Sequence, residues 1–312
     1  MQPEITPGKY LYVVCSTGND YFPEIAAVSI ASLRLVSPHA SITVLTDRET
    51  ANLDVPGMVV IRDTADDVVT LDCPGMESIE RSRFLKTGMR SLVSGRFLYL
   101  DSDTIIMKSP DAIWNFECDV AASPNLGVDG KSYFCADETP ETCARLGWTF
   151  GSRRYLNAGV IYFADTEAAH AVGNRYRSCW LDFRRVIGKP NDQLAFNHAV
   201  GLVEPRLIIL PGAYNAQITM NAMALRGATI VHFFTGNFGT SLETVAHQTA
   251  QRLKRDRVLD TSAIRSAVAS GNPWTRIDSY RKAIAANRYS SIGRVMLDRL
   301  GKRLRLHVQR RS

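Results

Sequence analysis

The sequence predicts an α/β protein with a mixed, mostly parallel sheet flanked by helices. Runs rich in apolar and β-branched residues are typical of strands, and they alternate with segments whose apolar residues have helical spacing. The predicted strands are residues 9–16, 41–46, 58–62, 96–100 and 228–234. Helical spacing lies between several of them, as in 25–36 and 78–94. Such alternation favours a parallel sheet covered by helices.

A basic, helical segment follows the α/β part. Residues 245–312 carry 16 Lys and Arg against 4 Asp and Glu, a balance of +12. Because the whole chain has a formal charge of +6, residues 1–244 have a net charge of −6 (6 − 12). We therefore expect an α/β domain over 1–244 and a basic helical C-terminal extension over 245–312. The acidic body argues against a basic groove, so nucleic acid is not an expected partner.

The end of this extension predicts an amphipathic helix. Its apolar positions recur at helical spacing, and its basic residues lie largely off that stripe: Ile292, Val295, Met296, Leu300, Leu304 and Val308 on the one hand, and Arg294, Lys302, Arg305 and Arg310 on the other. Such a helix can pack its apolar face on the α/β domain. It can equally lie at the surface of an anionic membrane.

Cysteine usage and hydropathy indicate a compartment. The six cysteines show no spacing typical of a zinc site, and we interpret them as reduced thiols. The N-terminus lacks a basic start followed by a long apolar run, so no signal peptide is predicted. No run approaches the roughly 20 apolar residues that a membrane span needs. We expect a cytoplasmic protein, which the basic extension would allow to sit peripherally on the inner face of the membrane.

The strongest local signal is the pair Asp101 and Asp103, directly after the apolar run 96–100. Ligands of α/β sheets bind at the carboxyl ends of strands. Two carboxylates there can hold one hard divalent cation, which in turn can hold a diphosphate. Sugar transfer from a nucleotide needs this arrangement, because the leaving diphosphate accumulates negative charge. Taken alone, the pair is equally compatible with a turn in which Asp accepts backbone hydrogen bonds.

Three later segments accompany this pair. Residues 153–165 place a small turn, Asn157-Ala158-Gly159, before an apolar strand. Residues 188–197 place Asp192 and Gln193 at a helix start, and residues 229–237 place His232 at a strand end. In this order and spacing, the four segments resemble GT-A glycosyltransferases of family 8, which include bacterial lipopolysaccharide galactosyl- and glucosyltransferases and glycogenin. The resemblance covers about residues 9–240.

The resemblance implies a metal site and a catalytic group. Asp101, Asp103 and His232 become the ligands of Mn²⁺ or Mg²⁺, which suits two carboxylates and one imidazole. Asn157 would hydrogen-bond the donor sugar, and Asp192 and Gln193 would face the reacting carbon and the sugar hydroxyls. Two structural alternatives stay open. His232 can be a core residue, and Asp192 can be a helix N-cap.

The loop 16–24 resembles the nucleotide-binding loop of this family. Tyr21 would stack on uracil, and the polar residues would meet ribose and base edges: Ser16, Thr17, Asn19 and Asp20. The alternative is an ordinary strand-to-helix loop rich in turn-forming residues.

The diphosphate has its own predicted contacts. The resemblance implies an Arg on the helix before Asp101 that holds it; Arg83 is the first choice, since its position 18 residues before Asp101 is close to the family spacing, and Lys86 is the second. Either could instead belong to a solvated helix face. Further donor contacts are expected at Ser102 and at Gly236 and Asn237, where backbone can approach a phosphate.

Two positions depart from the family pattern. Phe238 stands where the family usually has a Lys that binds phosphate, six residues after the metal His. Leu194 stands where it has a second Asp after the Gln. The first departure leaves Arg83, Lys86 or a residue of the extension to supply the missing charge.

The resemblance implies transfer of a hexose, with retention, from a UDP-linked or other nucleotide-diphosphate sugar to a hydroxyl of a saccharide, glycolipid or protein. The expected context is lipopolysaccharide or polysaccharide biosynthesis. One alternative is a non-catalytic nucleotide-sugar-binding or membrane-associated scaffold. Another is a phosphatase of the haloacid-dehalogenase type, which also places DxD after an apolar strand. In those enzymes the nucleophilic Asp opens the first strand, whereas four predicted elements precede Asp101 here.

Overall fold

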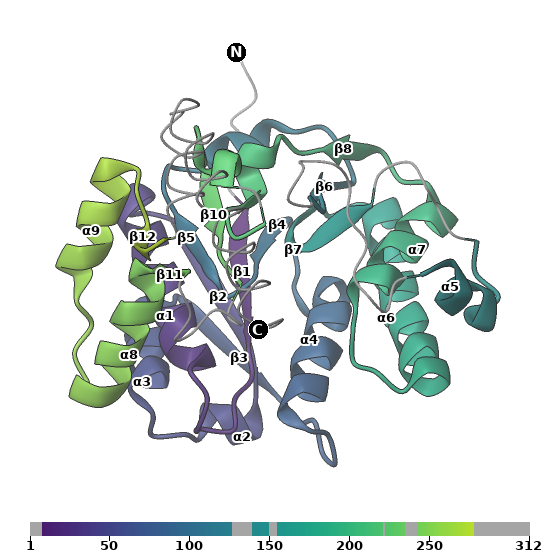
Figure 1. Ribbon diagram of the computed structural model, residues 1–312. Helices are drawn as coiled ribbons and strands as arrows, with labels where there is room; N and C mark the ends of the chain where they lie inside the picture. Colours follow the sequence, from purple (N-terminus) through teal and green to yellow (C-terminus); the bar gives the residue numbers. More distant parts are fainter. Residues whose placement is uncertain (1–7, 127–138, 150–154, 221, 235–241, 278–312) are drawn as a thin grey trace, which may run out of the picture.

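A seven-stranded sheet forms the centre of the molecule in the computed structural model (Figure 1). The structure describes residues 8–126, 139–149, 155–220, 222–234 and 242–277. The strand order is β3-β2-β1-β4-β7-β6-β8. The strands are β1 (Lys9–Val14), β2 (Ser41–Asp47), β3 (Asp67–Leu71), β4 (Phe97–Leu100), β6 (Val120–Pro124), β7 (Leu156–Phe163) and β8 (Leu207–Ile209).

The sheet is mixed and mostly parallel. Strands β3, β2, β1 and β4 are parallel neighbours, and β6 is parallel to β8. Strand β7 runs antiparallel to both β4 and β6. It is therefore the one reversed strand in this sheet, and it brings its own N-terminal end beside the carboxyl end of β4.

Alternating side chains of β1 supply two cores. Tyr10, Tyr12 and Val14 point to one face, and Leu11 and Val13 point to the other. Helices α1 (Phe22–Val36), α3 (Pro56–Thr64) and α8 (Val245–Asp256) cover the first face. Helices α4 (Ser78–Leu92), α6 (Glu167–Ile187) and α7 (Gln193–Val203) cover the second (Figure 1). The predicted layer arrangement is confirmed.

A small second sheet lies beside the central one, in the order β5-β10-β9. Its strands are β5 (Thr104–Ile106), β10 (Ile230–His232) and β9 (Ala216–Gln217). Strand β5 directly follows β4 along the chain, so the two sheets are connected at the carboxyl end of β4. The remaining short elements are α2 (Arg48–Ala51), η1 (Asp111–Asn115), α5 (Pro140–Leu146), η2 (Gly212–Asn215), η3 (Ala222–Leu225), β11 (Glu243–Thr244) and β12 (Trp274–Arg276).

The described part of the predicted extension packs on the α/β body. Helices α8 and α9 (Thr261–Ser270) place Ala246 and Ile264 in one apolar cluster with Ile25 of α1. The boundary near residue 244 stays a prediction, and the amphipathic segment after residue 290 lies outside the described residues. Within the described ranges, no helix is long and apolar enough to cross a membrane.

Two local predictions were wrong. Residues 58–62 form part of helix α3 and not a strand. Pro56 at its first turn fixes a helical φ, and the buried residues Met58 and Ile61 are three apart, which is a helical spacing that the apolar run concealed. The predicted turn Asn157-Ala158-Gly159 lies inside strand β7, where the carbonyl oxygen of Gly159 accepts a hydrogen bond from the N–H of Asp101.

Candidate active site

Asp101 and Asp103 lie in the connection between the two sheets. Strand β4 ends at Leu100 and β5 begins at Thr104, so both carboxylates sit at the carboxyl end of β4. The N–H of Asp101 donates to the carbonyl oxygen of Gly159 at 2.7 Å, and the Thr104 hydroxyl donates to the carbonyl oxygen of Asp101 at 2.9 Å. The first bond ties the connection to β7 and the second bridges the connection itself, and together they limit the positions that the carboxylates can take.

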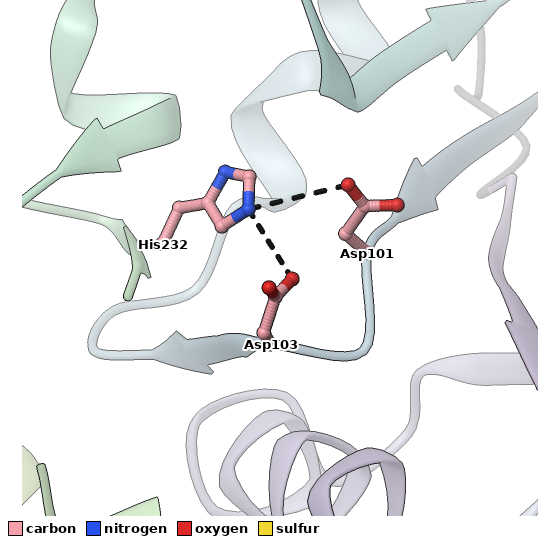
Figure 2. A group of neighbouring side chains, drawn as sticks. All are labelled: Asp101, Asp103 and His232. Atoms are coloured by element: carbon pink, nitrogen blue, oxygen red, sulfur yellow. Dashed lines mark ion pairs between the residues drawn. The ribbon is translucent and has the colours of Figure 1, made fainter. Parts of the chain in front are cut away.

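The small sheet brings His232 to these carboxylates. His232 is the last residue of β10 and lies opposite Thr104 of β5. Its Nε2 is 3.2 Å from Asp103 Oδ1 and 4.0 Å from Asp101 Oδ2 (Figure 2). One ligand atom from each of the three residues lies within 4.8 Å of the others. We call Asp101, Asp103 and His232 together the metal cluster, meaning the three side chains that could bind one ion. The side chains of Asp101 and Asp103 are 22% and 15% exposed and that of His232 is 3% exposed, so solvent reaches the metal cluster on its carboxylate side.

The residues of the metal cluster fit a divalent cation. Two carboxylates and one imidazole form a donor set that suits Mn²⁺ or Mg²⁺. Gly159 keeps the space beside them clear, since a Cβ there would lie 2.5 Å from His232 Cε1 and 2.8 Å from Asp101 Oδ2. Burial by itself lowers the pKa of His232, but the charges of Asp103 and Asp101 outweigh it and raise that pKa above its ordinary value. The imidazole therefore lies in a negative field that also attracts a cation.

A buried ion-pair network adjoins the metal cluster. Lys86 on α4 is 3% exposed, and its Nζ lies 3.1 Å from Asp101 Oδ1 and 3.3 Å from Asp192 Oδ2. One turn earlier, Arg83 Nε lies 3.1 Å from Asp192 Oδ1. Asp192 occupies the N-cap position of α7, yet its side chain makes no capping bond there. Its carboxylate instead forms ion pairs with the cationic side chains of α4.

The pKa of Asp192 reflects these partners. Burial alone raises it, but Lys86, Arg83 and the hydroxyl of Tyr176 outweigh burial and lower it to about 2. Tyr99, two residues before Asp101 on β4, donates its hydroxyl hydrogen to Asp101. Burial, followed by the charge of the neighbouring carboxylate, raises the pKa of each tyrosine well above its ordinary value. Both tyrosines are therefore neutral donors, and Asp192 is a fixed anion at neutral pH.

A cavity of about 240 Å³ opens beside Asp101 and Asp103. The end of β1, the start of α1 and the first turns of α4 enclose it: Val13, Cys15, Phe22, Ser78, Ile79, Ser82, Arg83, Tyr99, Asp101, Ser102 and Asp103. Phe22 and Ile79 are unusually exposed for large apolar side chains, at 38% and 42%. The cavity thus combines an apolar part with a charged end, which suits a ligand with a flat apolar group and an anionic group that a cation at Asp101 and Asp103 could hold.

The predicted nucleotide loop is held together by one carboxylate. Asp20 accepts hydrogen bonds from the Ser16 hydroxyl, from the N–H and hydroxyl of Thr17, and from the N–H of Phe22 at the start of α1. Burial raises the pKa of Asp20, yet these hydrogen bonds outweigh it and lower the pKa overall. The ring of Tyr21 faces Lys254 Nζ at 4.9 Å.

The cavity wall and the predicted loop are neighbours in the chain. Phe22 lines the cavity, but the five loop residues expected to contact the nucleotide do not. These five are Ser16, Thr17, Asn19, Asp20 and Tyr21. Ser102 and Arg83 are lining residues as well.

Asn157 and Gln193 approach the site from β7 and α7. Gln193 Oε1 accepts a hydrogen bond from the N–H of Ala158 at 3.1 Å, which ties the start of α7 to β7. Asn157 is buried, and its amide bonds with Asn125 and Asn215. Of the two departures from the family pattern, Leu194 is buried in a small apolar cluster. Phe238, Gly236 and Asn237 lie outside the described residues.

Solved structures resemble this chain over most of its length. The galactosyltransferase LgtC, solved with donor and acceptor sugar analogs, superposes with a TM-score of 0.51 at 13% identity, covering 89% of this chain and 100% of LgtC. An active-site mutant of LgtC gives a TM-score of 0.51 at 14% identity, with 89% and 99% covered. The bifunctional glycosyltransferase WbbM in its apo form also gives 0.51, at 12% identity, covering 86% of this chain and 51% of WbbM.

The chain has the GT-A fold. At these identities the likeness establishes the fold, and the fold predicted from the four segments is confirmed. No protein-family model and no curated protein matches the sequence.

Several residues of this candidate site were missed from sequence. Tyr99 could have been found, since residues two apart on a strand share a face and Asp101 follows it at that spacing. The others carry no local signal, because distant parts of the chain bring them together: Phe22, Ile79, Tyr176, Asn215 and Lys254.

Proposed function

We propose that this protein is a metal-dependent glycosyltransferase that transfers a hexose from a UDP-sugar to a hydroxyl acceptor, with retention. The observation that carries the proposal is the metal cluster at the polar end of the cavity. Its three ligand atoms lie within 4.8 Å of one another, at the carboxyl end of a strand in a GT-A fold. Both features are what a nucleotide-diphosphate ligand with a bound cation requires.

The two parts of the cavity match two parts of the proposed donor, the base and the diphosphate. Phe22 and Ile79 supply exposed apolar surface for a base, while the loop from Ser16 to Tyr21 borders the same wall. The diphosphate would lie toward Asp101 and Asp103, within reach of Ser102 and Arg83. Gly236 and Asn237 keep the phosphate-contact role that the family resemblance gives them.

Mn²⁺ or Mg²⁺ held by Asp101, Asp103 and His232 would supply Lewis-acid stabilisation of the leaving diphosphate. Lys86 places one positive charge of the protein itself beside Asp101, since its ammonium is buried between Asp101 and Asp192. In this chain Phe238 replaces the Lys of the family pattern. The position of Lys86 supports its assignment, together with Arg83, as the source of that missing charge.

The state of Asp192 supports a front-face route to retention. Its two oxygens are engaged by Lys86, Arg83 and Tyr176, so little of its charge is free for attack on an anomeric carbon. In the front-face route the acceptor hydroxyl forms the new bond to the anomeric carbon as the bond to the diphosphate breaks. The proton of that hydroxyl passes to the leaving phosphate oxygen. In this proposal Gln193 and Asn157 orient the donor sugar and stabilise the transition state, and neither attacks the anomeric carbon.

The proposed acceptor is a class of hydroxyl compounds, and the proposed location is a membrane surface. We propose a saccharide, glycolipid or protein hydroxyl as acceptor and a role in lipopolysaccharide or polysaccharide biosynthesis, at the cytoplasmic side of a membrane. The basic charge of residues 245–312 supports attraction to an anionic surface.

Mass spectrometry on a panel of UDP-, GDP- and dTDP-sugars with Mn²⁺ tests the proposal. Hydrolysis or transfer of a UDP-hexose, abolished by a chelator, is the expected result. Binding of a sugar nucleotide without turnover, with or without acceptor, would favour the scaffold alternative. The phosphatase alternative has less support, because Asp101 follows β4 in a GT-A fold and not the first strand.

A further inference from the structure

Three buried amide side chains form a chain of hydrogen bonds that ends at His232. Asn157 Nδ2 donates to Asn125 Oδ1 at 2.9 Å. Asn215 Nδ2 donates to Asn157 Oδ1 at 2.8 Å. Asn215 Oδ1 lies 3.0 Å from Nδ1 of His232. Asn125 directly follows β6, Asn157 lies in β7 and Asn215 ends η2. All four side chains are at most 5% exposed, so water does not compete for these bonds.

A backbone N–H determines how the side-chain amides of Asn157 and Asn215 are oriented. We call these two side chains the amide relay. The N–H of Gly159 lies 2.8 Å from the side chain of Asn157, and because an N–H can only donate, the atom it meets must be Oδ1. Asn215 must then present its NH₂ group to that same oxygen. Its own Oδ1 is left facing His232 Nδ1, which must therefore carry a hydrogen.

Reversing the relay is costly at every step. Turning Asn215 over would bring two amide oxygens together at 2.8 Å, and turning Asn157 as well would set its NH₂ against the N–H of Gly159. Each reversal leaves buried polar groups without partners. The relay therefore has one satisfied arrangement, and that arrangement needs the hydrogen on Nδ1.

We infer that Asn215 is a positioning residue that keeps His232 protonated at Nδ1 and so presents the Nε2 lone pair to the cation. Nε2 is the atom that faces Asp103 and Asp101. Histidines that bind metals usually donate their other ring N–H to an oxygen, which fixes the ring orientation. The metal-binding part of this inference rests on the proposed function, whereas the position of the hydrogen does not.

The first readout is the ¹H–¹⁵N spectrum of the His232 ring, assigned by the signal lost in His232→Gln. In the wild-type protein we expect a protected Nδ1–H signal, both without metal and with diamagnetic Mg²⁺ bound. Asn215→Leu should lose this protected signal. Asn215→Asp should keep it in the protonated carboxyl form, whose O–H can donate to Asn157 Oδ1 while its other oxygen still accepts from His232 Nδ1. A wild-type ring without a hydrogen on Nδ1 would overturn the inference even if Asn215→Leu does not fold.

The second readout is Mn²⁺ affinity, measured by electron paramagnetic resonance. Asn215→Leu should weaken binding by about 10- to 100-fold, the loss typical for a group that supports a metal ligand. Gln217→Met is the matched control, since Gln217 is also a buried amide beside β10 but bonds to Pro124 and Leu126 instead of to His232. It should leave both the signal and the affinity unchanged.

These readouts separate the inference from the proposed function. Wild-type Mn²⁺ affinity in a folded Asn215→Leu protein would contradict the inference. A protected Nδ1–H signal that depends on residue 215, in a protein that turns over no sugar nucleotide, would support the inference while the proposed function failed.

Discussion

Lys86 Nζ lies 3.1 Å from Asp101 Oδ1, so a buried ammonium neighbours one of the carboxylates of the metal cluster. The same ammonium contacts Asp192 at 3.3 Å, and it thereby links α4, β4 and the start of α7. A cation at this point offsets the repulsion between these carboxylates and lies near the diphosphate that we propose to bind there.

Lys86→Met should therefore affect both stability and activity. Removing one partner of a buried ion pair costs about 3–5 kcal/mol, because the remaining carboxylates are left uncompensated. Donor turnover should fall by about 100-fold or more. Denaturant titration and steady-state kinetics measure the two effects. Lys108→Met, at an exposed lysine, is the control and should change neither. Unchanged turnover in folded Lys86→Met would exclude Lys86 as the source of phosphate-binding charge.

Lys254 connects the C-terminal part of the chain to the loop 16–24, the predicted nucleotide loop. Its Nζ donates to the carbonyl oxygen of Gly18 at 3.0 Å and to that of Asp20, and it lies over the ring of Tyr21. Lys254→Met should raise the KM for the donor by about 10-fold with little change in kcat, since charged hydrogen bonds that order the loop are lost.

The size and specificity of this effect can be checked on the same helix. Arg255→Met is the matched control, because Arg255 is exposed and pairs with its neighbour Asp256. Lys254→Arg should recover part of the lost affinity. A fall in kcat at constant KM would contradict a role for Lys254 in donor binding.

Asp192 should make stability depend on pH in the acid range. Its folded-state pKa of about 2 lies below the ordinary value of 3.8, so the unfolded chain takes up the proton first as the pH falls. The stabilising contribution, about 2 kcal/mol, is fully present above about pH 4 and is lost as the pH falls toward 2. Urea titrations of wild type and Asp192→Asn across this range measure it. The difference in unfolding free energy should shrink toward low pH, and a difference that grows there would contradict the ion-pair account.

The basic end of the chain gives a further prediction from the sequence. Full-length protein should co-sediment with anionic liposomes at low salt, and truncation after about residue 288 should remove binding while donor hydrolysis survives. Salt near 0.5 M should weaken binding, since the Debye length is then about 4 Å. Neutral liposomes are the control. If the truncated chain still binds or no longer folds, these residues serve the structure of the protein and not membrane binding.

The sequence was sufficient where a property is local. Alternating apolar runs predicted the layers, and the motifs singled out Asp101, Asp103 and His232, which the fold brings together with one ligand atom each within 4.8 Å of the others. The strand prediction for 58–62 failed because a short run of Val and Ile suits a strand and a helix alike, and the deciding residue, Pro56, lies just before it.

Contacts between distant segments could not be predicted in this way. Asn157 and Asn215 are 58 positions apart, and Gly18 and Lys254 are 236 apart. Their partners depend on the order of strands in two sheets and on where α8 packs, which no short motif records. The amide relay and the loop contact of Lys254 therefore became apparent only from the fold.

Donor turnover by Asp103→Asn, compared with wild type, tests the central claim most directly. The substitution removes one charge at a partly exposed position and leaves the apolar cores intact. With a UDP-sugar and Mn²⁺, the rate of UDP release should fall by at least about 100-fold while the melting curve stays unchanged. Asp63→Asn, at an exposed aspartate of α3, should behave like wild type. Metal-dependent turnover at the wild-type rate in folded Asp103→Asn would contradict a metal site at Asp101, Asp103 and His232.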